Sequence, residues 1–307
     1  MISDLVIGQN IDDVFYCTKK TIGTTKNGDT YYTVTLQDKT GSVDGKIWEV
    51  TNLIEDFNSK DFVQVIGNVG SYKDSPQIKI TGISRIDKSR VNIDDFCPRT
   101  PKDIEELKTK LYNYIDSISN EYLQTLLNRF FRNEKFIEMF TFSSAAKQVH
   151  HAYIGGLIEH TIAVTDTCES MCKNYPELNR DLLITAAICH DIGKIKEISA
   201  FPDNDYTDEG NLLGHIYMGT EMINNQIRKI EGFPKTLGNE LKHCILSHHG
   251  KLEYGSPKVP ELMEAIILNM ADDMDAKMRR FIDTSTDDWS DKADFSLGTK
   301  IRKTRGE

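Results

Sequence analysis

The histidines of this chain stand at positions from which they could bind a metal together. All eight lie between residues 150 and 249, and several end or begin apolar segments typical of helices. Side chains at helix ends lie at the rim of a core, where they can converge on one pocket. Seven residues form this set: His160, His190, Asp191, His215, His248, His249 and Asp272.

Imidazole nitrogen combined with carboxylate oxygen, without thiolate, suits Mn²⁺, Fe or similar ions, and Zn²⁺ also accepts it. The two oxygens of Asp191 could bridge two ions. Ions about 3.5–4 Å apart activate water for in-line attack on phosphorus. Lys194, one helical turn later, offers a cation to phosphoryl oxygens. The pattern predicts a divalent-metal site suited to hydrolysis of a phosphate ester, with Asp191 and Lys194 as catalytic residues.

Most residues near this set are open to two interpretations. His150 and His151 could contact substrate phosphate or be exposed loop residues. His249 could replace or supplement His248 as a ligand, and Asp275 could bind the metal or support a ligand. Glu159 is expected to be a solvated neighbour of His160.

Composition restricts the class of protein. The six cysteines form no CxxC pair, so neither a thiolate zinc site nor a disulfide framework is indicated. No apolar run approaches the ~18 residues of a membrane span, and the N-terminus lacks the pattern of a signal peptide. We therefore expect a cytoplasmic protein without a membrane partner. A net charge of −10 gives no general attraction to nucleic acid but does not restrict what a shaped site binds.

Residues 14–87 have the pattern of β-structure. In the segment YYTVTLQ, Tyr32, Val34 and Leu36 alternate with polar or outward positions, as in a half-buried strand. Five such segments, with a helix expected over 51–57 between the third and fourth, give the order of an OB-fold barrel.

The period changes after residue 102 to the 3.6-residue repeat of amphipathic helices, from Ile104 to about residue 280. The predicted fold is α+β with two domains: a five-stranded OB-fold over 1–90 and an all-α domain over 103–282. Pro98 and Pro101 mark a linker over 91–102, and 283–307 is a polar tail.

One face of the predicted barrel could bind single-stranded nucleic acid by stacking bases on aromatic rings. Strand parity turns four side chains outward, and a loop extends the face by two more: Tyr31, Thr33, Lys46, Trp48, Tyr72 and Lys73. The alternative is that Trp48 packs against the 51–57 helix or the second domain.

The ordered set H…HD…H…HH…D, with HDIGK at 190–194, resembles the HD phosphohydrolase superfamily. The resemblance implies that four residues hold one ion: His160, His190, Asp191 and Asp272. It also implies that His215 and His248 hold a second ion.

An OB-fold followed by an HD domain, with HHAYIGGLIEHT before the doublet, resembles the YhaM family of bacterial 3′–5′ exoribonucleases. The resemblance implies an Mn²⁺-favoured enzyme that trims single-stranded RNA to nucleoside monophosphates, with single-stranded DNA as an open alternative. Two other functions stay open. One is hydrolysis of a small nucleotide, with the barrel as a regulatory module. The other is non-catalytic binding of single strands, with a structural metal.

Overall fold

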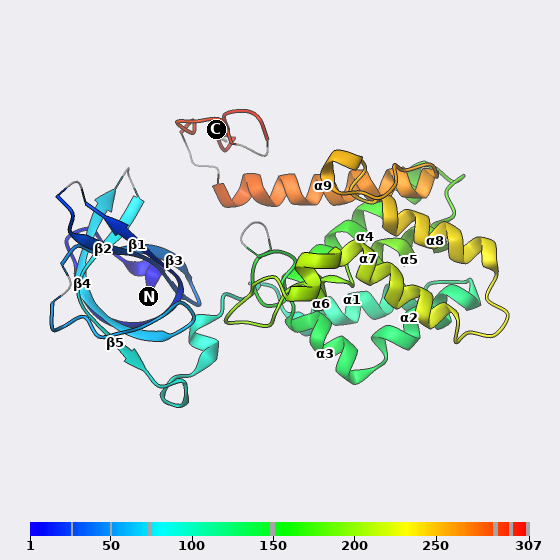
Figure 1. Ribbon diagram of the computed structural model, residues 1–307. Coiled ribbons are helices and arrows are strands. Elements are labelled where there is room, and N and C mark those ends of the chain that lie inside the picture. The colour runs from blue at the N-terminus through cyan, green and yellow to red at the C-terminus, as the bar shows by residue number, and fades with distance from the viewer. Residues whose placement is uncertain are drawn as a thin grey trace. The chain divides into compact units, whose positions relative to one another are not determined.

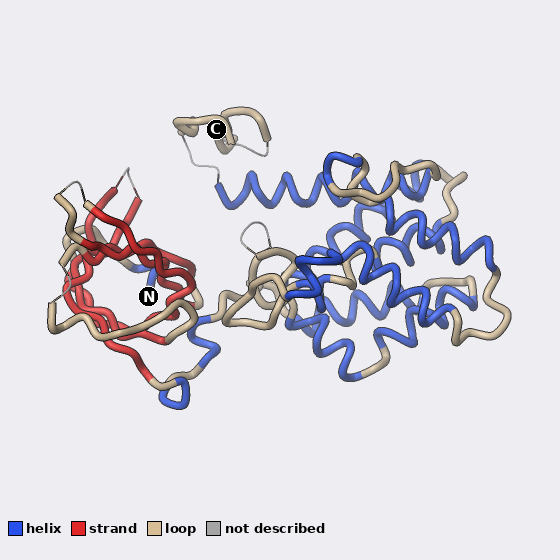
Figure 2. Tube along the Cα trace, in the orientation of Figure 1, coloured by secondary structure: helices blue, strands red, loops and turns tan. Residues whose placement is uncertain are grey.

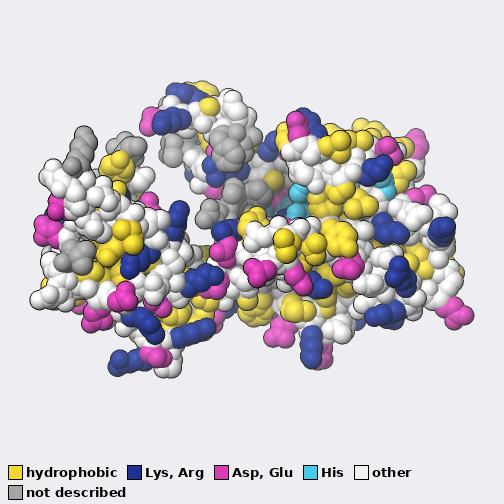
Figure 3. Space-filling model, in the orientation of Figure 1, with side chains coloured by type: hydrophobic (Ala, Val, Ile, Leu, Met, Phe, Trp, Pro, Cys, Tyr) yellow, Lys and Arg dark blue, Asp and Glu magenta, His cyan; other side chains and the backbone are white. Residues whose placement is uncertain are grey.

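The computed structural model describes residues 1–25, 27–49, 51–72, 75–147, 151–284, 288–294 and 297–304. The chain divides into two compact units, a β-barrel and a helical unit (Figure 1). The barrel unit holds Met1–Arg99 and the short segment Ala200–Asp203. The helical unit holds Thr100–Ser199 and Asn204–Glu307. On the face drawn in Figure 3, acidic and basic side chains are interspersed on both units.

Five strands close into a barrel (Figure 2). Their order around the barrel is β1-β2-β3-β5-β4. They are β1 (Asn10–Thr24), β2 (Thr30–Asp38), β3 (Gly41–Ile47), β4 (Phe62–Tyr72) and β5 (Ser75–Ile86). All neighbouring pairs are antiparallel except β3 and β5. The alternation in the sequence is confirmed, because Val34, Leu36, Val43 and Ile47 all face the buried interior.

The prediction of a helix over 51–57 is wrong. Ile54 instead forms a parallel β-bridge with Ile83, and Phe57 is buried in the barrel core. The backbone N–H of Glu55 donates to Ile83 O at 2.9 Å, and Ile83 N–H donates to Leu53 O at 2.9 Å. Apolar residues three and four positions apart resemble a helical face, but here Phe57 packs in the barrel core, Ile54 bridges to β5, and Leu53 is exposed.

The segment predicted to be a linker from residue 91 belongs in part to the barrel unit, which extends to Arg99. The short 3₁₀ turn η2 (Lys88–Arg90) precedes this segment, and a second one, η3 (Ile93–Phe96), lies within it. Phe96 is buried, and its ring centroid lies 5.0 Å from that of Phe62. These two rings and Tyr16 form a second, smaller core outside the barrel interior.

Replacing Phe96 by alanine should therefore lower the free energy of unfolding of the barrel unit by about 3–5 kcal/mol, the usual cost of deleting a buried ring. Urea titration followed by Trp48 fluorescence, in a Trp289→Phe background, measures this. Leu53→Ala is the matched control because Leu53 is 67% exposed, and it should change stability by less than about 0.5 kcal/mol. An equally small effect of Phe96→Ala would show that residues 91–99 are a linker.

The helical unit consists of nine α-helices in the described part of the chain. They are α1 (Ile104–Asp116), α2 (Glu121–Phe131), α3 (Glu134–Phe142), α4 (Gly156–Asn174), α5 (Arg180–Cys189), α6 (Lys194–Glu197), α7 (Asp208–Ile227), α8 (Lys235–Ser247) and α9 (Met263–Thr284). Asn or Asp side chains cap the first residues of α1, α2, α3 and α5. Residues 288–294 and 297–304 contain no helix or strand. Among the described helices, none has the length and apolar character needed to span a bilayer.

Two helices bear directly on the site. In α5, all residues from Leu182 to Cys189 are buried, so the helix is central in the unit's core. The residues of α7 depart from helical geometry at Gly214, which has φ 72° and ψ 155°. A positive φ is readily adopted only by glycine, so Gly214 allows the chain to restart as a helix at His215.

Candidate metal centre

The structure brings six residues of the predicted set into one cluster, each placed by the end or the inner face of a helix. His160 lies in the first turns of α4, and His190 caps the end of α5 directly before Asp191. His215 follows the break in α7, and His248 caps the end of α8. The sixth residue, Asp272, comes from α9.

Asp191 lies between two groups of histidines. Its Oδ2 is 3.3 Å from His190 Nε2 and 3.5 Å from His160 Nε2. Its Oδ1 is 3.5 Å from His215 Nε2 and 3.8 Å from His248 Nε2. Each oxygen of one buried carboxylate therefore faces a different pair of imidazoles.

Each pair gains a further member. Asp272 Oδ1 is 3.2 Å from His160 Nε2 and 4.0 Å from His190 Nε2. His249 joins the other pair, since its ring centroid lies 4.4 Å from that of His248 and 5.1 Å from that of His215. Both triplets have donor atoms within 4.8 Å of one another, a spacing at which one ion could be held.

The imidazoles are oriented by acceptors at their outer nitrogens. His190 Nδ1 lies 2.8 Å from Ala187 O, and His248 Nδ1 lies 2.7 Å from Ile245 O. A carbonyl only accepts, so Nδ1 of each ring carries the hydrogen and Nε2 keeps its lone pair. His215 Nδ1 is held in the same way by Glu197 Oε1 at 2.9 Å. Such outer partners are typical of metal-binding histidines.

The residues present fit a bound divalent metal. Three buried polar atoms around Asp191 have no hydrogen-bond partner among the described residues: Asp191 Oδ1, His215 Nε2 and His248 Nε2. Leaving such atoms unsatisfied is costly, so their convergence indicates a ligand. Burial holds the pKa of His248 well below its usual value, with His249 adding to the effect. A neutral imidazole is the form that binds metal.

Lys194 begins α6, and its Nζ lies 2.6 Å from Asp191 Oδ2. Burial opposes the charge of Asp191, but Lys194 and His190 hold the pKa of this carboxyl well below its usual range. Gly193 allows the approach of α6 to α7, because a Cβ there would lie 2.1 Å from His215 O. The glycine and the lysine of HDIGK thus serve different purposes: Gly193 allows α6 to pack closely on α7, and Lys194 keeps Asp191 ionised.

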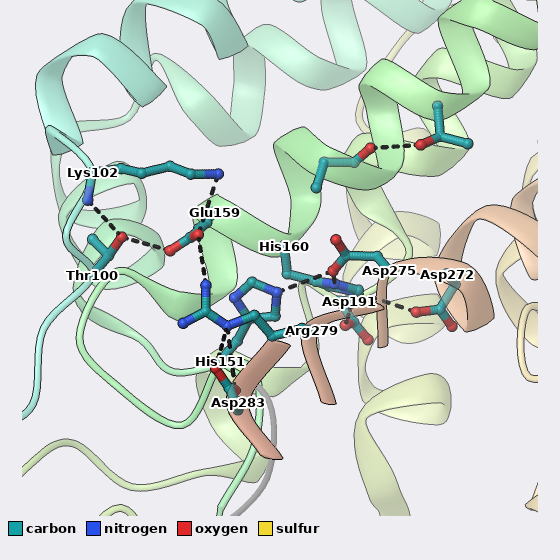
Figure 4. A network of polar contacts seen from close by, with 12 residues as sticks. Thr100, Lys102, His151, Glu159, His160, Asp191, Asp272, Asp275, Arg279 and Asp283 are labelled. Carbon is teal, nitrogen blue, oxygen red and sulfur yellow. Dashed lines mark hydrogen bonds and ion pairs between the residues drawn. The ribbon is translucent and has the colours of Figure 1, made fainter. Parts of the chain in front are cut away.

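One prediction about the neighbourhood is wrong, and one of two open alternatives is excluded. Glu159 is buried, not solvated: its carboxylate accepts hydrogen bonds from Thr100 Oγ1 at 2.5 Å and Tyr153 OH at 2.9 Å (Figure 4). His151 is also buried, so it is not an exposed loop residue. His150 lies outside the described residues.

Glu197 was missed by the sequence reasoning. Its Oε1 accepts from both the backbone N–H and Nδ1 of His215, each at 2.9 Å. The available signal was its position one helical turn after Lys194, on the side that faces the cluster.

The predicted face of the barrel also comes together, at the ends of β2 and β3. The rings of Tyr31 and Trp48 have centroids 5.1 Å apart. Lys46 Nζ lies 4.6 Å from the centre of the Tyr31 ring and 2.7 Å from Thr33 Oγ1. Trp48 is 46% exposed, and no helix covers it within the described part of the barrel unit.

Tyr72 is exposed but not beside this cluster. It pairs with Ser75 at the hairpin end of β4 and β5. The register of β3 and β5 pairs Asp44 with Gln77 and Lys46 with Lys79, so Tyr72 lies toward the start of β3, away from Trp48. Lys73 lies outside the described residues.

Comparison with known proteins agrees with both units. Residues 157–277 match the HD domain family, and residues 17–86 match a family described as an OB-fold nucleic acid binding domain. A 3′–5′ exoribonuclease YhaM from Oceanobacillus iheyensis is 37% identical over 89% of this chain and 86% of that protein. The YhaM of Bacillus subtilis is 34% identical over the same shares. With an OB-fold, an HD domain and this similarity along most of its length, the chain belongs to the YhaM family of 3′–5′ exoribonucleases.

Proposed function

We propose that this chain is a metal-dependent 3′–5′ exoribonuclease that hydrolyses single-stranded RNA to nucleoside monophosphates, with single-stranded DNA as a second substrate. The reaction direction and the RNA come from its relatives, which are named for this activity. The observation that carries the chemistry is the buried carboxylate of Asp191, with one oxygen facing each histidine group. Cytoplasmic location is part of the proposal.

In this proposal four residues would hold one ion: His160, His190, Asp191 and Asp272. His215 and His248 would hold a second ion together with Asp191, and His249 would supplement them. Divalent ions in such a site activate water and stabilise charge on the phosphoryl oxygens. The nitrogen and oxygen donors favour Mn²⁺ without excluding other transition metals.

Lys194 would have two tasks. Burial disfavours its charge, but the adjacent Asp191 carboxylate raises the pKa of the ammonium above its usual value. The side chain is therefore protonated at neutral pH, and it keeps Asp191 ionised. We propose that the same ammonium donates to the non-bridging oxygens of the scissile phosphate, where negative charge increases in the transition state.

The barrel would supply affinity for the strand. The Tyr31 and Trp48 rings offer faces on which bases stack, a contact that every base can make. Lys46, between them, would contact the phosphate backbone. Because the chain as a whole is acidic, this local arrangement matters more than the net charge.

The test uses single-stranded RNA labelled at either end, incubated with Mn²⁺, Mg²⁺ or chelator. Release of the 3′ label first, as a mononucleotide, is the expected result. Intact RNA beside hydrolysed free nucleotides would favour the small-nucleotide alternative. Intact RNA that remains bound, with no turnover of any nucleotide, would favour the non-catalytic alternative.

Substitutions on the barrel face test how much this face contributes to RNA affinity. Tyr31→Ala and Trp48→Ala should each weaken RNA binding by about 1–3 kcal/mol, roughly a 5- to 150-fold rise in Kd. Fluorescence anisotropy with labelled RNA measures this in an Asp191→Ala background, which prevents degradation. Lys46→Ala should lower the slope of log Kd against log salt by about one.

Ile66→Ala is the control on the same barrel, since Ile66 is 48% exposed on β4 and lies outside the aromatic cluster. It should bind RNA like the parent protein. If both aromatic variants also bind like the parent, the strand contacts another surface.

A further inference from the structure

His160 and His215 differ from His190 and His248 in what holds the outer nitrogen, because each of the first two lies against a carboxylate. His190 and His248 use backbone carbonyls, but His160 Nδ1 lies 2.7 Å from the carboxylate Oδ2 of Asp275. Asp275 is on α9, three residues after Asp272, so one face of the helix carries both. A carboxylate acceptor makes an imidazole a stronger donor to a metal than a carbonyl does.

The same oxygen of Asp275 is bound by a second imidazole. His151 Nε2 lies 3.0 Å from Asp275 Oδ2, and Figure 4 shows His151 and His160 approaching this carboxylate. His151 is 2% exposed and has φ 58°, a left-handed conformation uncommon outside glycine. Its other nitrogen, Nδ1, lies 2.9 Å from Tyr153 OH. Both nitrogens of this buried ring are therefore in use.

The contacts continue to the carboxylate that precedes His160. Tyr153 OH donates to Glu159 Oε2 at 2.9 Å, and Lys102 Nζ lies 3.2 Å from Glu159 Oε1. Glu159 is 2% exposed. A hydrogen-bonded series thus runs from Glu159 through Tyr153, His151 and Asp275 to His160, and it joins the 151–155 loop to α4 and α9.

We propose that Asp275 and His151 are positioning residues for the metal centre. Asp275 accepts the Nδ1 hydrogen of His160, which leaves Nε2 as the lone-pair nitrogen directed at Asp272 and Asp191. His151 holds the Asp275 carboxylate in place from its other side. The proposal rests on the metal centre of the proposed function but not on the identity of the substrate.

A third ion bound by His151, His160 and Asp275 is the competing interpretation, because their donor atoms are also within 4.8 Å of one another. The hydrogen bonds favour a positioning role. None of these three residues has a buried polar atom without a partner, whereas Asp191, His215 and His248 do. The Asp275 carboxylate lies on the outer nitrogen of His160, away from the cluster around Asp191.

The test measures metal binding without RNA. Full-length protein is stripped of metal, and Mn²⁺ affinity is determined by competition with a fluorescent chelator. Asp275→Ala should weaken the affected site by about 10- to 100-fold, the usual cost of losing such a partner. Asp275→Asn should lose less, because its amide oxygen still accepts from His160. His151→Ala should lose less than Asp275→Ala, because it acts one contact further away.

Asp273→Ala is the matched control. Asp273 adjoins the site in sequence, but its side chain is 54% exposed and pairs with Lys277 at 2.6 Å. This variant should bind Mn²⁺ like the wild type. The d–d absorption bands of Co²⁺-loaded protein give a second measurement, and they should change in Asp275→Ala but not in Asp273→Ala.

Wild-type affinity in both Asp275→Ala and Asp275→Asn would overturn the proposal. So would a stoichiometry of three ions per wild-type chain that falls to two in Asp275→Ala, because Asp275 would then be a ligand. Thermal melting of the metal-free variants separates loss of fold from loss of binding, and Asp275→Asn decides if Asp275→Ala unfolds. If the variants lose Mn²⁺ affinity as expected but the wild type leaves RNA intact, only the proposed function is contradicted.

Discussion

Asp191→Ala should reduce RNA hydrolysis by roughly 10³-fold or more while leaving RNA binding intact. Asp191 is the one described residue whose two side-chain oxygens face both histidine groups, so its loss affects both proposed ions. Metal ions supply several kcal/mol of transition-state stabilisation, and about 4 kcal/mol corresponds to a 10³-fold change in kcat. Single-turnover cleavage of 5′-labelled RNA measures this loss.

Asp191→Asn, which keeps the shape of the side chain, should show a loss of the same order. Binding of RNA by either variant should match the wild type, because the aromatic cluster of the barrel is unchanged. Asp273→Ala serves again as the exposed control and should retain full activity. Cleavage by Asp191→Ala within tenfold of the wild-type rate would show that the reaction does not depend on this cluster.

Removal of metal should abolish activity and lower thermal stability together. Asp191 Oδ1, His215 Nε2 and His248 Nε2 have no hydrogen-bond partner among the described residues, so an ion that satisfies them would stabilise the folded state relative to the unfolded chain. At a free Mn²⁺ concentration 100 times Kd, this linkage contributes about 2.7 kcal/mol. The midpoint of the helical unit should then rise by roughly 5–10 °C, which differential scanning calorimetry in chelator and in Mn²⁺ measures.

The loss of activity and the loss of thermal stability should both result from removal of the same ions. Mn²⁺ returned after chelation should restore cleavage and melting temperature over the same concentration range. Asp191→Ala should show a much smaller rise in melting temperature with Mn²⁺. Full activity in excess chelator would contradict a metal-dependent mechanism, whatever the melting behaviour.

The sequence indicated the fold where hydrophobic periodicity decides the structure. Alternation placed Val34 and Leu36 inside the barrel, and both are buried. It misled at Ile54 and Phe57, whose helix-like spacing serves a bridge to β5 and a place in the barrel core. The burial of Phe96 depends on partners more than 30 residues earlier in the chain, which no local pattern reveals.

The same division applies to the site. The six clustered residues could be proposed because helix ends and family order mark them in the sequence. Glu197 was not singled out, Glu159 was expected to be solvated, and two roles for Asp275 stayed open. Each of these residues acts through a side chain that only the tertiary fold brings near. A carboxylate next to a histidine in sequence is usually solvated, and its burial depends on what packs over it.

The helices around the site differ in burial, and this difference determines where amino-acid substitutions are tolerated. The doublet His190-Asp191 ends α5, every residue of which from Leu182 to Cys189 is enclosed by the core. A new side chain there would have to fit a space already filled. By contrast, α7 has two exposed residues, Leu212 and Leu213, just before the Gly214 break and His215. Descendants of this enzyme could vary α7 before the break at little cost in stability, while α5 kept the chemistry constant.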